Sequence, residues 1–306
     1  MSSLEVNTRT IDHIVHLTPP GTVNEVSERF RKLGFKVLPG GTHADGLTEN
    51  ALVVLRDGTY LELISFTHPV SYYPENSPER TKREGHRWAN SAPGRIDYAF
   101  LGNGSLEEGH LISEIINARA EVEGSGVKYL REVGGGRVRP DGKILKWVIS
   151  APASGRDEIG SLPFFCGDIT PRSLRVQTEP PSNTEHPSTA FGLAYLDLLV
   201  SPARFEEMKK RLTSVLASSP SPGDTDQTAF WDLEFVADLP PRIYPRPLLS
   251  LGVPSNDAQR KFLAETQPEG ESGVGIYEVS FYVEHLDVGY PEEAETPYGR
   301  IRFIRI

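Results

Sequence analysis

The sequence repeats one order of strands and helices, and this repeat constrains the fold more than any other feature. Residues 11–66 give the pattern strand, helix, strand, strand, strand. Residues 95–170 give the same order, and the Ile-Asp-Tyr of residues 96–98 stands where the first unit has the Ile-Asp-His of residues 11–13. Such a repeat predicts modules that bury their apolar faces against one another. We therefore predict an α+β fold of tandem βαβββ modules with curved mixed sheets that enclose a pocket.

Local signals support the predicted elements. Val23, Val26, Phe30 and Leu33 recur at spacings of three and four, which indicates one apolar helix face. Gly34 follows as a helix-ending residue. The predictions for the first unit are strands 11–17, 35–38, 51–55 and 59–66 with a helix over 23–33. Those for the second unit are strands 95–101, 129–133, 145–150 and 162–165 with a helix over 105–122.

The segments outside the repeat complete the predicted division of the chain. Residues 67–94 have no hydrophobic period and predict a long surface connection. Residues 171–189 are rich in Pro, Ser, Thr and Glu, which is typical of a linker. Residues 190–306 predict a degenerate third module that ends in an edge strand over 299–306. The paired modules would then form one domain over residues 1–170.

Composition excludes several classes of function. The net charge is −10 and the pI about 5.4, which argues against binding to nucleic acid or to anionic membranes. Cys166 is the single cysteine, so neither an internal disulfide nor a cysteine-based zinc cluster is expected. We expect no secretory signal, because the first fifteen residues have no basic segment followed by an apolar core, and no apolar run has membrane-spanning length. We expect a soluble, cytoplasmic protein.

Two polar residues within predicted strands are the best indication of function. His13 and Glu62 each lie in a segment that otherwise alternates with apolar residues. Burying such a group without a partner costs roughly 2–7 kcal/mol. Their matching places in two strands predict a shared pocket. The alternatives are a hydrogen-bonded core histidine for His13 and, for Glu62, an ion pair with an arginine such as Arg95 or an outward-facing position.

His43 and Tyr98 each have a functional and a structural interpretation, and His16 has a structural one. His43 follows Gly-Gly-Thr in a loop, where it would either contact a ligand or cap a turn. Tyr98 would either pack in the core or donate a hydrogen bond into the pocket. His16 lies an odd number of residues from His13, so it should point to the opposite strand face.

The chain resembles the glyoxalase-like domain branch of the vicinal oxygen chelate superfamily. In the first unit the resemblance rests on IDHIV (11–15), LGF (33–35), GGTH (40–43), GLTENA (46–51) and YLELI (60–64). Weaker matches are RIDYAF (95–100), RPDG (139–142), LPFF (162–165) and the His-Pro of residues 186–187. The resemblance covers residues 11–170 and extends with less detail to about residue 285.

This resemblance implies paired modules around one cavity, with a divalent metal ion held from the first and last strands. His13 and Glu62 match the two ligand positions of the first module. Tyr98 and, within one residue, Phe165 match those of the second, and neither is a usual metal ligand. A catalytic ion generally needs about three protein ligands. His43 is the predicted third ligand, and the remaining candidates are His16, His186 and Asp197.

The resemblance also implies a small-molecule enzyme. We expect lyase or isomerase chemistry in which a proton is abstracted from a compound with adjacent oxygens. Glu62, His13 and Tyr98 are the predicted catalytic residues, with one Zn, Ni, Mn, Fe or Co ion or with no metal. The alternative is a metal-free protein of the same fold that binds or sequesters a small molecule. The chain would act as a monomer or a homodimer.

Overall fold

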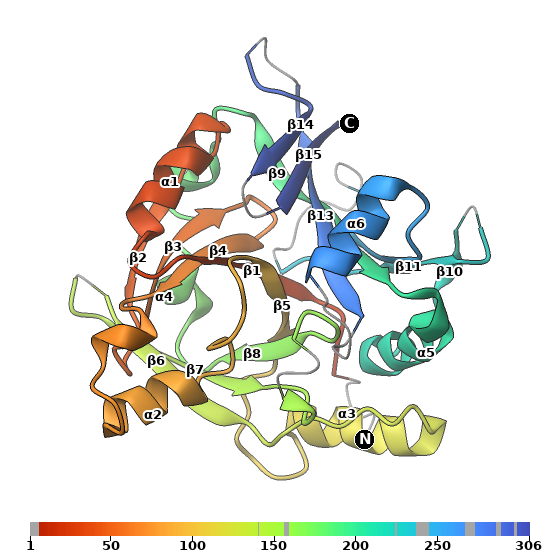
Figure 1. Cartoon of the computed structure of the whole chain (residues 1–306), viewed down its shortest axis with the longest axis horizontal. Helices are drawn as coiled ribbons and strands as arrows, with labels where there is room; N and C mark the ends of the chain where they lie inside the picture. Colours follow the sequence, from red (N-terminus) through yellow and green to blue (C-terminus); the bar gives the residue numbers. More distant parts are fainter. Residues whose placement is uncertain are drawn as a thin grey trace.

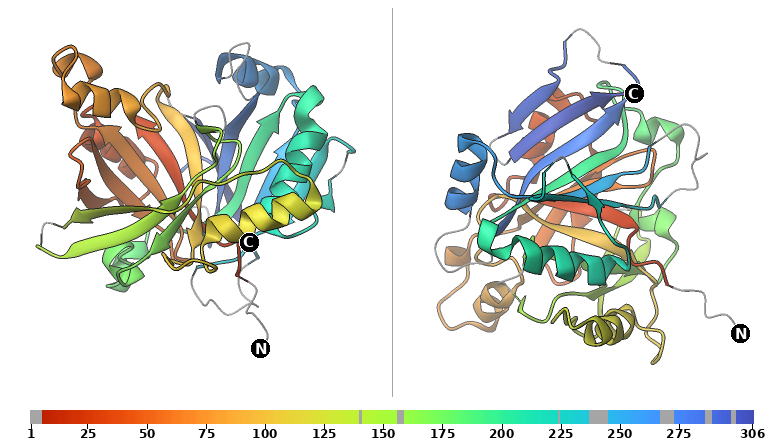
Figure 2. Two further views of the ribbon diagram at one scale, coloured as in Figure 1. Left: turned by 90° about the horizontal axis from the view of Figure 1, so that it is seen from below. Right: turned by 90° about the vertical axis from the view of Figure 1, so that its right-hand side faces the viewer.

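The computed structural model describes residues 6–139, 141–155, 159–223, 225–236, 245–266, 273–285, 289–296 and 299–306. Within these residues the strands form one eight-stranded and one seven-stranded sheet. Figures 1 and 2 show the two curved sheets side by side, with the helices around them. No helix in the described part of the chain is both long and apolar enough to cross a membrane.

The first sheet contains both predicted modules. Its strand order is β2 (Leu38–Thr42), β3 (Thr48–Val54), β4 (Tyr60–Phe66), β1 (Ile11–Thr18), β5 (Gly94–Gly102), β8 (Phe164–Asp168), β7 (Ile144–Ser150) and β6 (Val133–Val138). Strands β1 and β5 pair antiparallel at the centre and join the modules. The outer strands also approach each other, since His43 and Arg137 form a bridge and the Ala44 N–H donates to the Gly136 carbonyl. The sheet is therefore nearly closed.

The helices of these modules lie close to their predicted positions. Helix α1 (Val23–Lys32) buries Val23, Val26 and Phe30, and the partly buried Leu33 caps its end before Gly34, which has a φ of +85°. Helix α3 (Ile112–Glu123) begins seven residues later than predicted, after Gly109 with a φ of +81°. Strand β2 also begins later than predicted, at Leu38. It continues through the glycines at positions 40–41, where a register shift marks a β-bulge.

The second sheet holds a third module and a shorter fourth unit. The third consists of β9 (Ala190–Val200), η4 (Pro202–Arg204), α5 (Phe205–Leu216), β10 (Ser221–Pro222), β11 (Thr228–Asp232) and β12 (Leu248–Gly252). The fourth follows α6 (Asp257–Thr266) and consists of β13 (Val274–Val283), β14 (Glu293–Thr296) and β15 (Gly299–Arg305). The order is β10-β11-β12-β9-β13-β15-β14. The predicted edge position of the last strand is wrong, because β15 lies between β13 and β14.

One hydrophobic core joins the two sheets. Phe35 follows α1 and lies 5.2 Å from Phe281 of β13 and 5.5 Å from Phe303 of β15, between ring centroids. Apolar residues of β1, β4 and β5 belong to the same buried cluster as those of β9, β12 and β13. The division into a domain over 1–170, a linker and a domain over 190–306 stays a prediction.

Both predicted connections contain helical turns that the sequence analysis did not assign. Residues 67–94 include η1 (Val70–Tyr72) and α2 (Pro78–Gly85). The Ser77 hydroxyl accepts a hydrogen bond from the Arg80 N–H and caps α2. Residues 171–189 include α4 (Arg172–Arg175) and η3 (Pro181–Thr184). Each connection supplies side chains to the cavity of the first sheet.

Candidate functional site

The first sheet encloses a cavity of about 860 Å³. Most of its wall is apolar and includes Leu52, Ile64, Trp88, Leu145, Trp147, Phe164 and Cys166. Its polar lining includes His13, His43, Asn50, Glu62, Arg137 and Arg175. Hydrophobic walls with a few polar groups are typical of a small-molecule site.

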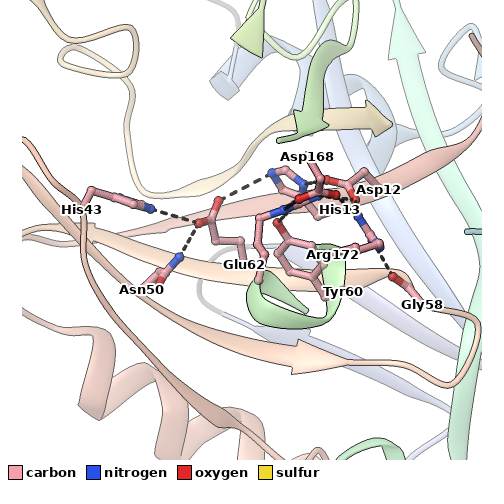
Figure 3. Close-up of polar contacts among 10 residues, drawn as sticks. Asp12, His13, His43, Asn50, Gly58, Tyr60, Glu62, Asp168 and Arg172 are labelled. Atoms are coloured by element: carbon pink, nitrogen blue, oxygen red, sulfur yellow. Dashed lines mark hydrogen bonds and ion pairs between the residues drawn. The ribbon is translucent and has the colours of Figure 1, made fainter. Parts of the chain in front are cut away.

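The pairing of β1 with β4 brings His13 and Glu62 together. Both side chains alternate along their strands with core residues such as Ile14, Leu61 and Leu63, so they point to the opposite face. The Nε2 atom of His13 lies 3.7 Å from Oε2 of Glu62, and the residues are only 3% and 6% exposed. The two strand residues singled out from the sequence therefore meet in one hollow (Figure 3).

A bulge in β1 places Asp12 beside its neighbour His13. Ile11 and His13 pair with the adjacent residues Phe100 and Ala99 of β5, so Asp12 is an extra residue in the strand. A bulge allows two successive side chains to be redirected from their normal alternation. The carboxylate of Asp12 lies 2.7 Å from Nδ1 of His13.

Asp12 is held as an anion. Burial raises its pKa, but the guanidinium groups of Arg172 and Arg175 outweigh this effect and keep the pKa well below 3.8. Arg175 donates to Oδ2 of Asp12 at 2.8 Å, and Arg172 donates to Oδ1. Because a carboxylate only accepts hydrogen bonds, Nδ1 of His13 must carry a proton. The Nε2 atom is then the one directed at Glu62.

Aromatic rings fix the orientation of His13. The ring of Tyr60 stacks on the imidazole with 4.6 Å between centroids and 15° between planes. Phe164 packs against it edge-on at 5.4 Å. Arg175 donates to the Tyr60 hydroxyl at 2.7 Å, so the arginine that holds Asp12 also holds this ring. Tyr60 lies on β4 and Phe164 on β8, the last strands of the two modules.

Glu62 has one close hydrogen bond and two nearby imidazoles. The amide of Asn50 donates to Oε1 at 2.6 Å, and Nε2 of His43 lies 3.9 Å from the same oxygen. Nδ1 of His43 lies 2.6 Å from the Thr48 hydroxyl. Burial lowers the pKa of His43, although Glu62 opposes this effect. Figure 3 shows Asn50 and His43 approaching Glu62 from the side opposite to His13.

The comparisons with known proteins agree with this architecture. Residues 11–216 match the family model described as a glyoxalase-like domain. The chain belongs to the glyoxalase-like domain family. This confirms the resemblance inferred from the IDHIV and YLELI segments, and the curved mixed sheets are consistent with the predicted fold. No curated protein matches the chain.

A solved structure shares the fold of this glyoxalase-like chain. A hypothetical protein from Staphylococcus aureus has a TM-score of 0.62 and 14% identity, with 97% of this chain and 99% of that chain covered. A xylose isomerase-like TIM barrel/4-hydroxyphenylpyruvate dioxygenase fusion protein has a TM-score of 0.47 and 11% identity, with 92% and 37% covered. A 4-hydroxymandelate synthase mutant from Streptomyces coelicolor has the same score and identity, with 92% and 72% covered.

Tyr98 does not reach the cavity. It is fully buried in the core shared by the two sheets, and its hydroxyl donates to the Ser161 carbonyl at 3.1 Å. Phe165 lies in the same core. The predicted pocket positions in the second glyoxalase-like module are therefore wrong. A one-residue error along a strand places a side chain on the opposite face.

The strand register identifies the true counterparts. Ala99 of β5 pairs with Phe164 of β8, just as His13 of β1 pairs with Tyr60 of β4. Cys166 lies two residues further along β8, where the first module has its glutamate. Burial raises the pKa of Cys166 to about 12, so it is a neutral thiol. The second glyoxalase-like module thus has no ionised counterpart of the first module's pair.

The other candidate ligands lie outside the cavity. His16 packs edge-on against Phe30 at 5.1 Å, on the opposite face of β1. His186 accepts from the Lys36 N–H, and its other ring nitrogen lies 3.0 Å from a backbone carbonyl. Asp197 lies in the second sheet, where it accepts a hydrogen bond from Ser250. None of the three completes a metal site with His13.

The donor groups do not fit a three-ligand metal centre. Among the residues that the structure describes, no group of three or more His, Cys, Asp or Glu side chains is arranged to hold a metal ion. His13 and His43 approach different oxygens of Glu62, and Asn50 already donates to one of them. A catalytic metal generally has about three protein ligands around one point. The described donor groups therefore do not converge on one point as three ligands of a metal ion would.

No local sequence pattern indicates Arg172, Arg175 or Arg137, the arginines of the site. Arg172 and Arg175 come from the predicted linker, and their contacts with Asp12 span about 160 residues, so no local pattern indicates them. Arg137 lies on β6 at the edge of the first sheet. The connection before β5 adds His86, Arg87 and Trp88 to the cavity wall. A sequence signal exists only for this last set. Ser77 followed by Pro and Glu is typical of a helix start, and the helix that begins there leads to residues 86–88.

Proposed function

We propose that this chain is a glyoxalase-like enzyme that moves a proton at a carbon atom next to a carbonyl group. Its substrate would be a small molecule with oxygens on adjacent carbons, and the reaction would be of the lyase or isomerase type. The observation that carries the proposal is the pair of His13 and Glu62, 3.7 Å apart, in the wall of a largely apolar cavity. A carboxylate positioned in such a cavity is suited to abstracting a proton from carbon.

Glu62 is the proposed base. Asn50 donates to Oε1 and orients the carboxylate, which leaves Oε2 for the substrate. Oε2 takes the proton from carbon, and the electron pair of the C–H bond moves to the carbonyl oxygen to form an enolate. Return of the proton to the former carbonyl carbon, with transfer of the hydroxyl proton to the other oxygen, would complete an isomerisation. Expulsion of a leaving group from the carbon β to the carbonyl, on the other side of the deprotonated carbon, would instead give a lyase reaction.

His13 is the proposed partner for the substrate oxygens. Asp12 accepts the Nδ1 proton, so Nε2 of the neutral ring has a free electron pair. This nitrogen can accept a proton from a substrate hydroxyl and return it to the adjacent oxygen, while Asp12 stabilises the imidazolium formed in between. Tyr98 takes no part, since its hydroxyl is bonded to Ser161 in the core.

Binding without catalysis is the second candidate function. The aromatic and aliphatic lining, which includes Trp88, Trp147 and Phe164, favours a ligand with an apolar body. A sequestration protein would use this lining and would not need a carboxylate with a free oxygen at Glu62. The cytoplasmic location, the lack of nucleic-acid binding and the monomeric or homodimeric state stay predictions.

Proton exchange with solvent separates the two functions. The purified protein is incubated in D2O with a panel of 2-hydroxyketones and 2-hydroxyaldehydes, and loss of the signal of the C–H next to the carbonyl is followed by NMR. We expect accelerated exchange for at least one compound, and its loss in Glu62→Gln. Glu49→Gln is the control, because it makes the same chemical change on β3 at the residue before Asn50. It should keep the wild-type exchange rate.

Metal dependence is tested separately by elemental analysis of the same protein. Because the donor groups do not fit a three-ligand centre, we expect far less than one Zn, Ni, Mn, Fe or Co ion per chain. One ion per chain in the wild type, absent from a His13→Ala variant, would contradict the metal-free mechanism. Unaccelerated exchange across the whole panel, together with tight binding of its members, would support sequestration.

A further inference from the structure

Arg137 is a buried arginine in the cavity wall whose role is not explained by the fold. It lies on β6, is 3% exposed and lines the cavity together with Glu62. Among the residues that the structure describes, its Nη1 atom has no hydrogen-bond partner and its guanidinium forms no ion pair. A buried donor without a partner costs about 1–3 kcal/mol relative to a paired one, and more when it is charged.

The other arginines around this cavity are paired. Arg175 and Arg172 both bind Asp12 and Asp168. Arg87 binds the buried carboxylate of Asp97 at 2.9 Å. Each of these guanidinium groups has a protein carboxylate as its partner, although Nη2 of Arg87 is itself buried without a hydrogen bond to the described part of the chain. Arg137 differs because no carboxylate pairs with it among the described residues.

The surroundings of Arg137 hold it within the pocket. Its backbone forms a bridge with His43, where the outer strands of the first sheet meet. Nη1 lies 3.3 Å from the position that a Cβ atom would take at Gly41, so a side chain there would crowd the guanidinium. Burial lowers the pKa of Arg137 and Glu62 opposes this effect, so the carboxylate and the guanidinium act on each other without forming an ion pair.

We propose that Arg137 binds a carboxylate group of the ligand, and that the ligand is an organic acid with an apolar body. The planar guanidinium matches the two oxygens of a carboxylate. A single unpaired guanidinium is matched in charge by a monocarboxylate. The aromatic and aliphatic wall, which includes Trp147 and Phe164, would hold the rest of the molecule. This inference rests on the proposed function, because it names the substrate class of the same site.

Calorimetric titration with matched probes tests the inference without requiring turnover. The probes are 3-phenylpropanoate, its neutral amide 3-phenylpropanamide, and inorganic phosphate. For the wild type we expect the carboxylate to bind about tenfold or more tightly than the amide, as a charge-assisted hydrogen bond allows. Arg137→Met removes the charge at similar length and should reduce this preference to about twofold or less.

Two further variants keep the result interpretable. Arg137→Lys retains the charge without the planar fork and should keep a smaller preference, which covers the case in which the methionine variant does not fold. Arg131→Met makes the same chemical change at an exposed arginine paired with Glu108, and it should bind all probes as the wild type does. Equal binding of carboxylate and amide by the wild type, or no binding of either, would overturn the proposal.

Glu62→Gln separates this inference from the proposed function. Removing the negative charge near Arg137 should leave carboxylate binding unchanged or tighter, while the exchange reaction is lost. An Arg137-dependent preference in a protein that exchanges no carbon-bound proton would keep the carboxylate site and refute the proposed reaction. Exchange that depends on Glu62, without tighter binding of the carboxylate than of the amide, would support the proposed reaction and refute the carboxylate site. Inorganic phosphate that displaces 3-phenylpropanoate at equal concentration would assign the site to phosphate and contradict the carboxylate.

Discussion

The two sheets of this chain are built from the same module, yet their carboxylates have opposite surroundings. In the first sheet, Glu62 faces a cavity and has one hydrogen bond, from Asn50, with imidazoles at 3.7 and 3.9 Å. In the second sheet, Glu278 forms ion pairs with Arg300 at 2.7 Å and with Arg302 at 3.1 Å.

The second sheet pairs two of its carboxylates, Glu278 and Glu293, with arginines of β15. Arg300 and Arg302 also pair with Glu293 of β14, so two acidic and two basic side chains form one network across neighbouring strands. Both arginines alternate along β15 with the core residues Ile301 and Phe303. The comparison indicates that one scaffold can use a strand-borne carboxylate for structure or leave it available to a ligand.

The largest expected effect is the difference between Glu62 and Glu278. Glu62→Gln should lower the turnover of the exchange reaction by about 10²–10⁴-fold, because a positioned general base contributes on that order. Glu278→Gln should leave turnover within about twofold and lower the melting temperature instead. Steady-state rates and thermal denaturation of both variants check this. Similar rate losses in the two variants would remove the functional distinction between the sheets.

Asp12→Asn tests how much the contact between Asp12 and His13 contributes to turnover, compared with the proposed base Glu62. The substitution removes one of the two anions that Arg172 and Arg175 share, and Asp168 remains, so it should destabilise the fold by about 3 kcal/mol, the lower end of the cost of breaking a buried ion pair. It also removes the group that fixes the Nδ1 proton of the imidazole, so turnover should fall more than substrate binding. Urea denaturation and separate measurement of kcat and KM check both effects. Unchanged stability would contradict the described ion pairs.

The sequence predicted the cavity residues of the first module and failed in the second for a definite reason. His13 and Glu62 stand out because each is a polar residue in an apolar strand. Tyr98 was chosen by matching Ile-Asp-Tyr to Ile-Asp-His, but β1 contains a bulge at Asp12 and the register shifts. The true counterpart is Ala99, which carries no chemical signal. A bulge depends on strand pairing, so the repeat alone could not indicate it.

The arginines that contact residues far away in the sequence could not be predicted either. Arg175 contacts Asp12 across 163 positions, and it lies in a segment whose composition indicates a linker. Arg137 lies in a glycine-rich strand whose edge position follows only from the order of strands in the sheet. The modules, by contrast, were predictable because their helices and strands carry local periodicity.

Asp197→Asn tests the electrostatics of the second sheet. Burial raises the pKa of Asp197 from 3.8 to about 6, although the hydrogen bond from Ser250 opposes this effect. The folded protein therefore binds the proton more tightly than the unfolded chain, and the wild type loses stability as the pH rises from about 4 to 6. The asparagine variant avoids this loss, so its relative stability should improve by about 2 kcal/mol across that range. Denaturation at pH 4.5 and pH 7.5 checks the sign, and a constant difference would contradict it.

Ser77→Ala is expected to have the smallest effect. It changes only the connection that lies beside the cavity of the first sheet. The hydroxyl caps α2, the helix that precedes the cavity residues His86, Arg87 and Trp88. Loss of such a cap costs about 1 kcal/mol. We expect a melting temperature lower by about 2 °C and ligand binding weakened by about twofold. An unchanged affinity would indicate that this segment covers the cavity without affecting the ligand.

A crystal structure of the protein with the compound that exchanges fastest would test the central claim most directly. We predict that the reacting carbon lies about 3–3.5 Å from Oε2 of Glu62, with a substrate oxygen within hydrogen-bond distance of Nε2 of His13. A ligand bound against the second sheet, or one in the cavity whose oxygens contact neither residue, would contradict the account.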